Sequence, residues 1–127
     1  MSIVSHGQAD LVDGLIRQLA RQTAFGLIDR VVLTLNIPEK IPDDWAKLGA
    51  FELKVIRNQR PDGFAANHNR ALAGQTQGIV AVLNPDLQLV GDPLSLLCEA
   101  AMGPGVGLVA PIVLEENGEP ADSARDL

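Results

Sequence analysis

The residues of this 127-residue chain that could do chemistry gather between Asn58 and Asp86. A predicted helix begins at Gly63 and carries asparagines in its first turns. It is followed by an apolar run, 79–83, which ends in Asn84-Pro85-Asp86. Such a Val-rich run is typical of a strand covered on both faces of a parallel sheet. Ligands of these sheets lie outside the carboxyl ends of the strands, so Asp86 is placed to meet a ligand or a metal ion. The tripeptide Asn-Pro-Asp is equally typical of a turn. The residues alone therefore leave open whether Asp86 binds a ligand or only caps a turn.

Composition narrows the class of protein. The length favours one domain, and a hydrophobic content of 46% excludes a disordered chain. No apolar run approaches the ~18 residues of a membrane span, and residues 1–6 lack the pattern of a secretory signal, so a cytoplasmic location is expected. The single cysteine, Cys98, excludes an internal disulfide and is expected in a core. A net charge of −6 argues against a nucleic-acid partner.

Alternating strands and helices must position these residues. Hydrophobic periodicity predicts an α/β domain over 1–114 and a polar tail over 115–127. Right-handed crossovers between strands then give a mostly parallel, Rossmann-like sheet with flanking helices. The predicted strands are 3–4, 31–35, 53–56, 79–83 and 106–114; the predicted helices are 9–23, 64–73 and 93–103, with one helical turn near 44–48.

Several segments, taken in order, resemble one family. The sharpest matches are Asn58 with the helix start 63–72 (GFAANHNRAL) and the strand end 82–86 (VLNPD). Weaker matches are Val4-Ser5-His6, Thr34-Leu35-Asn36 and the segment 117–125. Together they resemble the nucleotide-binding half of family-2 glycosyltransferases with the GT-A fold, in the rhamnosyltransferase-like branch. The resemblance runs from Ile3 to about Arg125 and implies a truncated GT-A domain.

The resemblance implies an enzyme that binds a nucleoside-diphosphate sugar, dTDP-rhamnose or a UDP-sugar, and transfers the sugar with inversion to an acceptor hydroxyl. The leaving diphosphate would be neutralised by Mg²⁺ or Mn²⁺ at the family's Asp-x-Asp position. Here Asp86 supplies the only carboxylate of that motif, because Asn84 replaces the first aspartate. A metal site at Asp86 is therefore expected to form together with the substrate.

The resemblance also implies a set of residues that bind the nucleotide sugar. Many relatives have an aspartate before the asparagine at the second strand end, where it contacts the base; this chain has Leu35 there, followed by Asn36. Asn36 could still bond a base edge, or could be a turn residue. All members of the set should meet at one edge of the sheet. They are Ser5, His6, Asn36, Asn58, Gly63, Asn67, Asn84 and Asp86.

The general base that inversion requires is not expected in this chain. The late carboxylates, Glu115, Glu116, Glu119 and Asp122, lie in a polar tail and favour a solvated turn. The chain alone is therefore expected to be inactive, and the alternative is a truncated or degenerate domain that binds nucleotide, or a partner, without catalysis. The acceptor would be a polysaccharide or a glycolipid, the latter bringing the chain to a membrane surface. Self-association is expected to cover the edge of a truncated sheet.

Three further residue types carry weaker signals. His68 has no partner at metal-ligand spacing; it could lie near the phosphates of a bound nucleotide, but an exposed helical histidine is the expectation. One of Arg57, Arg60 and Arg70 could meet a diphosphate. Trp45 is expected to cover a hydrophobic edge.

Overall fold

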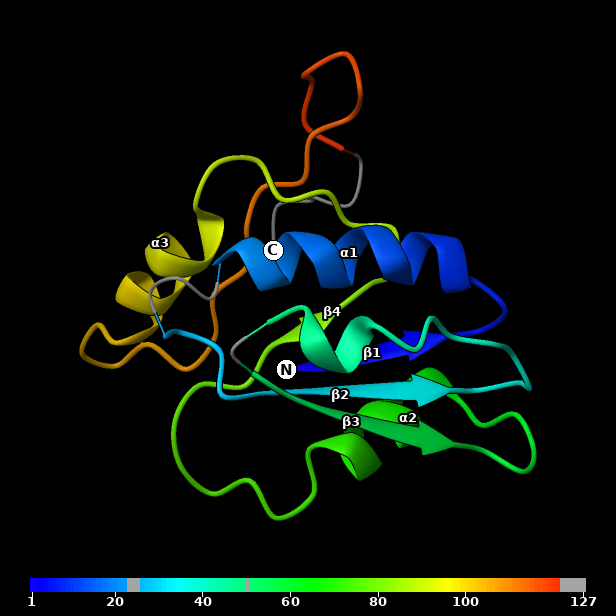
Figure 1. The fold of residues 1–127 in the computed structure, drawn as a ribbon. Coiled ribbons are helices and arrows are strands. Elements are labelled where there is room, and N and C mark those ends of the chain that lie inside the picture. Colours follow the sequence, from blue (N-terminus) through cyan, green and yellow to red (C-terminus); the bar gives the residue numbers. More distant parts are fainter. Residues whose placement is uncertain (23–25, 50, 122–127) are drawn as a thin grey trace. The chain divides into compact units, whose positions relative to one another are not determined.

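A four-stranded sheet of order β3-β2-β1-β4 forms the centre of the fold (Figure 1). The computed structural model describes residues 1–22, 26–49 and 51–121. All ladders are parallel, and Ile3 of β1 lies between Leu33 of β2 and Leu83 of β4. The predicted α/β class, with a parallel sheet and flanking helices, is confirmed. The strands are β1 (Ser2–Ser5), β2 (Arg30–Leu35), β3 (Glu52–Arg57) and β4 (Val82–Leu83).

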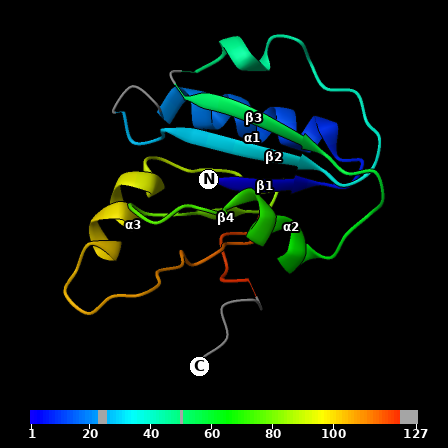
Figure 2. The same ribbon diagram turned by 90° about the horizontal axis from the view of Figure 1, so that it is seen from below.

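Helices cover both faces of this sheet. The chain moves from β1 through β2 to β3 and then returns to the far side of β1, so right-handed crossovers place its helices on opposite faces. α1 (Ala9–Gln22) and the 3₁₀ helix η2 (Trp45–Lys47) lie on one face, and α2 (Phe64–Ala71) lies on the other (Figures 1 and 2). The central strand β2 is consequently buried from Val31 to Leu35.

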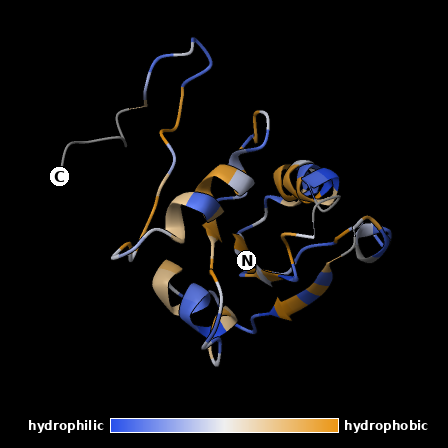
Figure 3. Ribbon diagram, turned by 90° about the vertical axis from the view of Figure 1, so that its left-hand side faces the viewer, coloured by the Kyte–Doolittle hydropathy of each residue, from blue (hydrophilic) through white to orange (hydrophobic). Residues whose placement is uncertain are grey.

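α1 presents an apolar stripe to the core. Its buried residues are Val12, Leu15, Ile16 and Leu19, which share one helical face, and Figure 3 shows polar residues on the other side of the helix. Each such side chain contributes about 1.5–3 kcal/mol when fully buried. The helix was predicted to reach Thr23, which lies outside the described residues.

The indole of Trp45 joins η2 to α1. Its ring is fully buried, and Nε1 donates a 2.6 Å hydrogen bond to Asp13 Oδ1 in α1. Asp13 also accepts a 2.9 Å bond from Arg17 Nε. Trp45 is therefore a core residue that ties the β2–β3 connection to the helix above it.

The strand at 79–83 differs from its prediction. Only Val82 and Leu83 form β4, and Ile79, Val80 and Val82 are about half exposed. β4 is an edge strand with β1 as its neighbour, and the exposure of its side chains shows that this segment is not covered on both faces. The apolar run predicted a strand correctly but could not show that no further strand among the described residues pairs with it.

Residues 93–127 form a second compact unit, separate from 1–92. α3 (Pro93–Ala101) begins at the predicted proline. The strand predicted over 106–114 is absent from the described residues; Leu114 forms one isolated antiparallel bridge with Pro120, and Leu108 is 84% exposed. An apolar run becomes a strand only when a neighbour pairs with its backbone. The predicted division into a domain over 1–114 and a tail over 115–127 stays a prediction.

None of the helices in the described parts of the chain has both the length and the apolar character needed to cross a membrane.

Candidate functional site

The carboxyl ends of the four strands meet at one edge of the sheet. Parallel pairing aligns Ser5 with Leu35, and Leu35 with Arg57, so the chain leaves these strands side by side. The next residues, His6, Asn36 and Asn58, therefore emerge at the same edge, as does the segment that follows Leu83 of β4. This is the edge at which open α/β sheets bind their ligands.

A cavity of about 310 Å³ opens at this edge. Five of the eight predicted binding residues line it, namely His6, Asn36, Asn67, Asn84 and Asp86. The remaining wall is formed by Val4, Gln8, Phe64, His68, Leu83 and Pro85. The volume is at the lower end of the range of small-molecule sites, which are commonly about 300–1,000 Å³.

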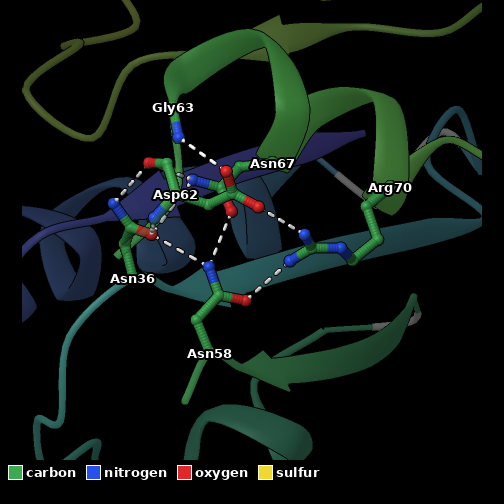
Figure 4. Close-up of polar contacts among 6 residues, drawn as sticks. All are labelled: Asn36, Asn58, Asp62, Gly63, Asn67 and Arg70. Carbon is green, nitrogen blue, oxygen red and sulfur yellow. Dashed lines mark hydrogen bonds and ion pairs between the residues drawn. The ribbon is translucent and has the colours of Figure 1, made fainter. Parts of the chain in front are cut away.

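Three asparagines at this edge of the sheet bind one another. We call Asn36, Asn58 and Asn67 the asparagine cluster (Figure 4). Asn36 Oδ1 accepts hydrogen bonds from Asn58 Nδ2 at 2.9 Å and from Asn67 Nδ2 at 3.1 Å, and Asn58 Nδ2 also lies 2.7 Å from Asn67 Oδ1. Amide side chains suit this arrangement because each offers both donors and acceptors.

The asparagine cluster also holds the loop that precedes α2. Asn36 Oδ1 accepts from the Asp62 backbone N–H at 2.8 Å, while Asn36 Nδ2 and Asn67 Nδ2 donate to the Asp62 carbonyl. Asn36 Nδ2 donates its second hydrogen to His6 Nδ1, at 3.1 Å. Both hydrogens of the Asn36 amide are therefore used within the protein, and contact with a base would require one of these bonds to break.

Arg70 fixes the same loop from the outer side of α2. Its guanidinium donates to Asp62 Oδ2 at 2.5 Å and to Asn58 Oδ1 at 2.9 Å (Figure 4). The pKa of the Asp62 carboxyl lies below its usual value, mainly because Arg70 donates a hydrogen bond to it and secondly because the Gly63 N–H does so. Both partners are partly exposed, so this ion pair contributes little stability. Arg70 is committed to the loop in this state, and its predicted role toward a diphosphate stays a prediction.

Ser5 lies next to the cavity, bound to a residue that the sequence did not single out. Its Oγ donates to Glu39 Oε2 at 2.9 Å and accepts from Gln8 N at 3.2 Å, and Gly7 N donates to Glu39 Oε1 at 3.3 Å. The Glu39 carboxylate thus accepts from one donor at the end of β1 and one in the β1–α1 loop. Gly7 is suited to this turn because its φ is +80°.

A second cavity, of about 210 Å³, lies beside the first at the ends of β2 and β3. Its apolar lining comes from Leu35, Ile37 and Pro38, and its polar lining from Glu39, Arg57 and Asn58. Asn58 is the member of the asparagine cluster that faces this second cavity, whereas Asn36 and Asn67 face the first.

His68 is buried, contrary to the prediction of an exposed helical histidine. It is 4% exposed, and its Nδ1 lies 2.8 Å from the fully buried Ser2 Oγ of β1. Its Nε2 is buried without a hydrogen-bond partner among the described residues. Leaving such a group unpaired costs about 1–3 kcal/mol. Burial lowers the pKa of His68, so the imidazole is neutral at pH 7. The helical pattern alone did not show that this face of α2 packs against β1.

Asp86 is exposed and forms no hydrogen bond or ion pair with the described residues. Asn84, also exposed, lines the same cavity and offers an amide oxygen. Within the described ranges no group of three or more His, Cys, Asp or Glu side chains could hold a metal ion. The residues present therefore fit a divalent ion only if a bound ligand supplies most of the coordinating oxygens.

The structure thus brings the predicted residues to one edge but gives them different surroundings. Ser5 and Gly63 do not line the first cavity; Ser5 bonds Glu39, and Gly63 N donates to Asp62 Oδ1. Glu39, Asp62 and Phe64 were not predicted. The position of Asp62 directly before the helix-opening Gly63 was the one sequence signal that could have identified it.

Comparison with known proteins leaves the family open. No family model matches the chain, and no solved structure matches it. A curated relative, the uncharacterized protein y4gI of Sinorhizobium fredii (strain NBRC 101917 / NGR234), is 26% identical over 113 residues. The match covers 84% of this chain and 12% of that relative. The chain therefore spans a small part of the relative's length.

Proposed function

We propose that this chain is the donor-binding part of an inverting GT-A glycosyltransferase, and that it binds dTDP-rhamnose or a UDP-sugar. One observation carries the proposal. The exposed carboxylate of Asp86, which has no partner in the part of the chain that the structure describes, lines a cavity at the carboxyl edge of a parallel sheet together with Asn84, His6 and Asn67. Polar groups gathered at such an edge are the usual surroundings of a bound nucleotide.

Asp86 and Asn84 are the residues that would hold Mg²⁺ or Mn²⁺. A bound divalent ion would neutralise the charge that develops on the leaving diphosphate. A single carboxylate with an amide oxygen is a poor site by itself, so Asp86 holds the ion only when the diphosphate completes the set of ligands. Donor and metal then bind as a pair.

The second cavity is where we place the base. Its apolar wall, Leu35, Ile37 and Pro38, suits the face of a pyrimidine. Asn58 donates both Nδ2 hydrogens to Asn36 and Asn67, but its Oδ1, which accepts from Arg70, can accept a second bond from an N–H on the base edge. Asn36 then acts indirectly, since its Oδ1 accepts from Asn58 Nδ2 and keeps that side chain in place. The diphosphate would extend from this cavity toward Asp86.

The sugar-transfer step requires a general base that we do not assign to this chain. Glu115, Glu116 and Glu119 are exposed, and the Glu115 and Glu119 backbones close a turn in the unit 93–127. Asp122 lies outside the described residues, as does the weak family match at 123–125. The acceptor, a polysaccharide or glycolipid hydroxyl, would be held elsewhere.

Thermal unfolding tests the donor site. UDP and dTDP are expected to raise the Tm of the chain only when Mg²⁺ or Mn²⁺ is present, because binding to the native state stabilises it by mass action. Asp86→Asn should abolish the metal-dependent part of the shift while leaving the Tm of the free protein unchanged, since the exposed carboxylate has no partner among the described residues.

Asp43→Asn is the matched control, because Asp43 is exposed and lines neither cavity. This variant should keep the full shift. Equal metal-dependent shifts in the wild type and in Asp86→Asn would refute the assignment of Asp86. No shift with any nucleoside diphosphate would leave the non-catalytic interaction domain as the better description.

A further inference from the structure

His68 has no role in the donor site as proposed so far, although it lines the same cavity. It is the buried imidazole in the wall of the first cavity, and its Nε2 has no partner among the described residues. Buried polar groups in folded proteins nearly always have a hydrogen-bond partner, so the unpaired, buried nitrogen of a residue that lines a cavity points to a partner that arrives with a ligand.

The hydrogen bond with Ser2 determines which tautomer of the His68 imidazole is favoured. The Ser2 hydroxyl has His68 Nδ1 as its single hydrogen-bond partner among the described residues. If the hydroxyl donates to Nδ1, its hydrogen is satisfied and the ring proton lies on Nε2. The opposite arrangement would leave the hydroxyl hydrogen without an acceptor inside the protein. Burial disfavours the doubly protonated ring. The favoured form is therefore a neutral imidazole with an Nε2–H donor.

We propose that His68 is a ligand-binding residue that donates its Nε2–H to a phosphate oxygen of the bound nucleotide, and that Ser2 is the positioning residue that selects this tautomer. The inference rests on the proposed function, because it takes the ligand to be a nucleoside diphosphate. A neutral N–H donor can bind a phosphate oxygen without adding a full positive charge to a site where Asp86 would hold a metal ion.

Phe64 packs against this imidazole. Its ring lies edge-to-face against the imidazole, with the centroids 4.3 Å apart, and lines the same cavity. Phe64 is 61% exposed, so its ring can rotate without disrupting the core. We take this rotation to be the movement that admits a phosphate oxygen to Nε2.

Nuclear magnetic resonance of the imidazole rings tests the inference directly on the intact chain. The protein has two histidines, so a long-range proton–nitrogen spectrum contains two rings, and a His6→Gln variant assigns them. We expect His68 to show a protonated Nε2 and an unprotonated Nδ1 in the free protein. The Nε2 signal should shift when UDP and Mg²⁺ are added. A free-protein spectrum with the proton on Nδ1 would overturn the proposal.

Affinity for UDP with Mg²⁺, measured by calorimetry, supplies the second readout. Losing one donor to a phosphate should weaken binding about fivefold to tenfold in His68→Phe, which retains a ring. Ser2→Ala keeps the imidazole but should mix the tautomers in the spectrum and weaken binding less. If His68 had only a structural role, its substitution would lower the Tm and leave the Kd of the folded protein unchanged. The spectral and affinity changes therefore distinguish ligand binding from a structural role.

The outcomes separate this inference from the proposed function. Metal-dependent binding that is unchanged in His68→Phe, with no shift of Nε2, would overturn the role of His68 and leave the Asp86 site standing. Absence of UDP binding to the wild type would overturn both. If His68→Phe does not fold, the Nε2 shift in the wild type and the Ser2→Ala affinity still decide the question.

Discussion

Asparagine side chains have two different surroundings at the carboxyl edge of the sheet. The amides of Asn36, Asn58 and Asn67 bond one another and the Asp62 backbone, whereas Asn84 is exposed at the cavity. A buried amide network is stable only when each donor and acceptor is paired, so its members hold the loop before α2 in one position. The exposed Asn84 is free to meet a ligand.

The asparagine cluster can be tested with two asparagines of the same helix. Asn67 is buried and bonded to Asn36, Asn58 and Asp62, while Asn69 is exposed. Asn67→Ala should lower the free energy of unfolding by about 1–3 kcal/mol, because it leaves buried partners unpaired. Asn69→Ala should stay within about 0.5 kcal/mol of the wild type. Urea unfolding measures both, and equal effects would contradict the structural role of the cluster.

Sheet position separates two strands that look alike in sequence. β2 and the run 79–83 are both Val-rich and apolar. β2 is a central strand of the sheet, however, whereas β4 is an edge strand. Val31 of β2 is fully buried, whereas Val82 of β4 is 48% exposed. The helices on both faces cover β2, and the same composition therefore has different energetic consequences in the two strands.

A pair of isosteric substitutions tests this difference between strands. Val31→Thr buries a hydroxyl in the core and should destabilise the fold by about 1–3 kcal/mol. Val82→Thr exposes its hydroxyl to water and should change stability by less than about 0.5 kcal/mol. Chemical denaturation of both variants is the measurement. A large loss in Val82→Thr would mean that the edge strand is covered in solution, as self-association of the chain would cause.

At the scale of the whole chain, the proposed donor site is contained in residues 1–92. Both cavities and the asparagine cluster lie in this unit, while the late carboxylates belong to 93–127. Leaving-group stabilisation needs only the strand ends of the first unit. Attack on the sugar also needs a positioned acceptor and a base.

The chain alone is therefore expected to bind the donor without transferring sugar at an appreciable rate. General-base assistance is typically worth ~10²–10⁴ in rate, and no carboxylate of the unit 93–127 is assigned that role. Incubation with Mn²⁺ and dTDP- or UDP-sugars, followed by analysis of nucleotide release and glycosylated product, is the measurement. Slow donor hydrolysis agrees with the expectation. Rapid transfer to an acceptor would contradict it and make Glu115 and Glu116 the first candidates for the base.

The sequence was sufficient for the local elements of the first unit and for the edge at which its polar residues meet. Period 3.6 in α1 and short apolar runs in β1 to β3 predicted these elements to within a few residues, because hydrophobic periodicity reflects burial on one face or both. The position of Asn36, Asn58, Asn84 and Asp86 directly after strands then predicted a common edge, since parallel strands end together.

Only the tertiary structure decided which of those side chains are bonded within the protein and which are exposed at the cavity. Nothing local to Asn36 or Asn67 shows that their amides bond each other, because the partners are 31 residues apart. His68 became buried only because α2 packs against β1, which brings Ser2 within 2.8 Å across 66 residues. The run 79–83 is partly exposed and 106–114 forms no strand for the same physical reason. Pairing and burial depend on neighbours distant in sequence, which periodicity within a segment cannot specify.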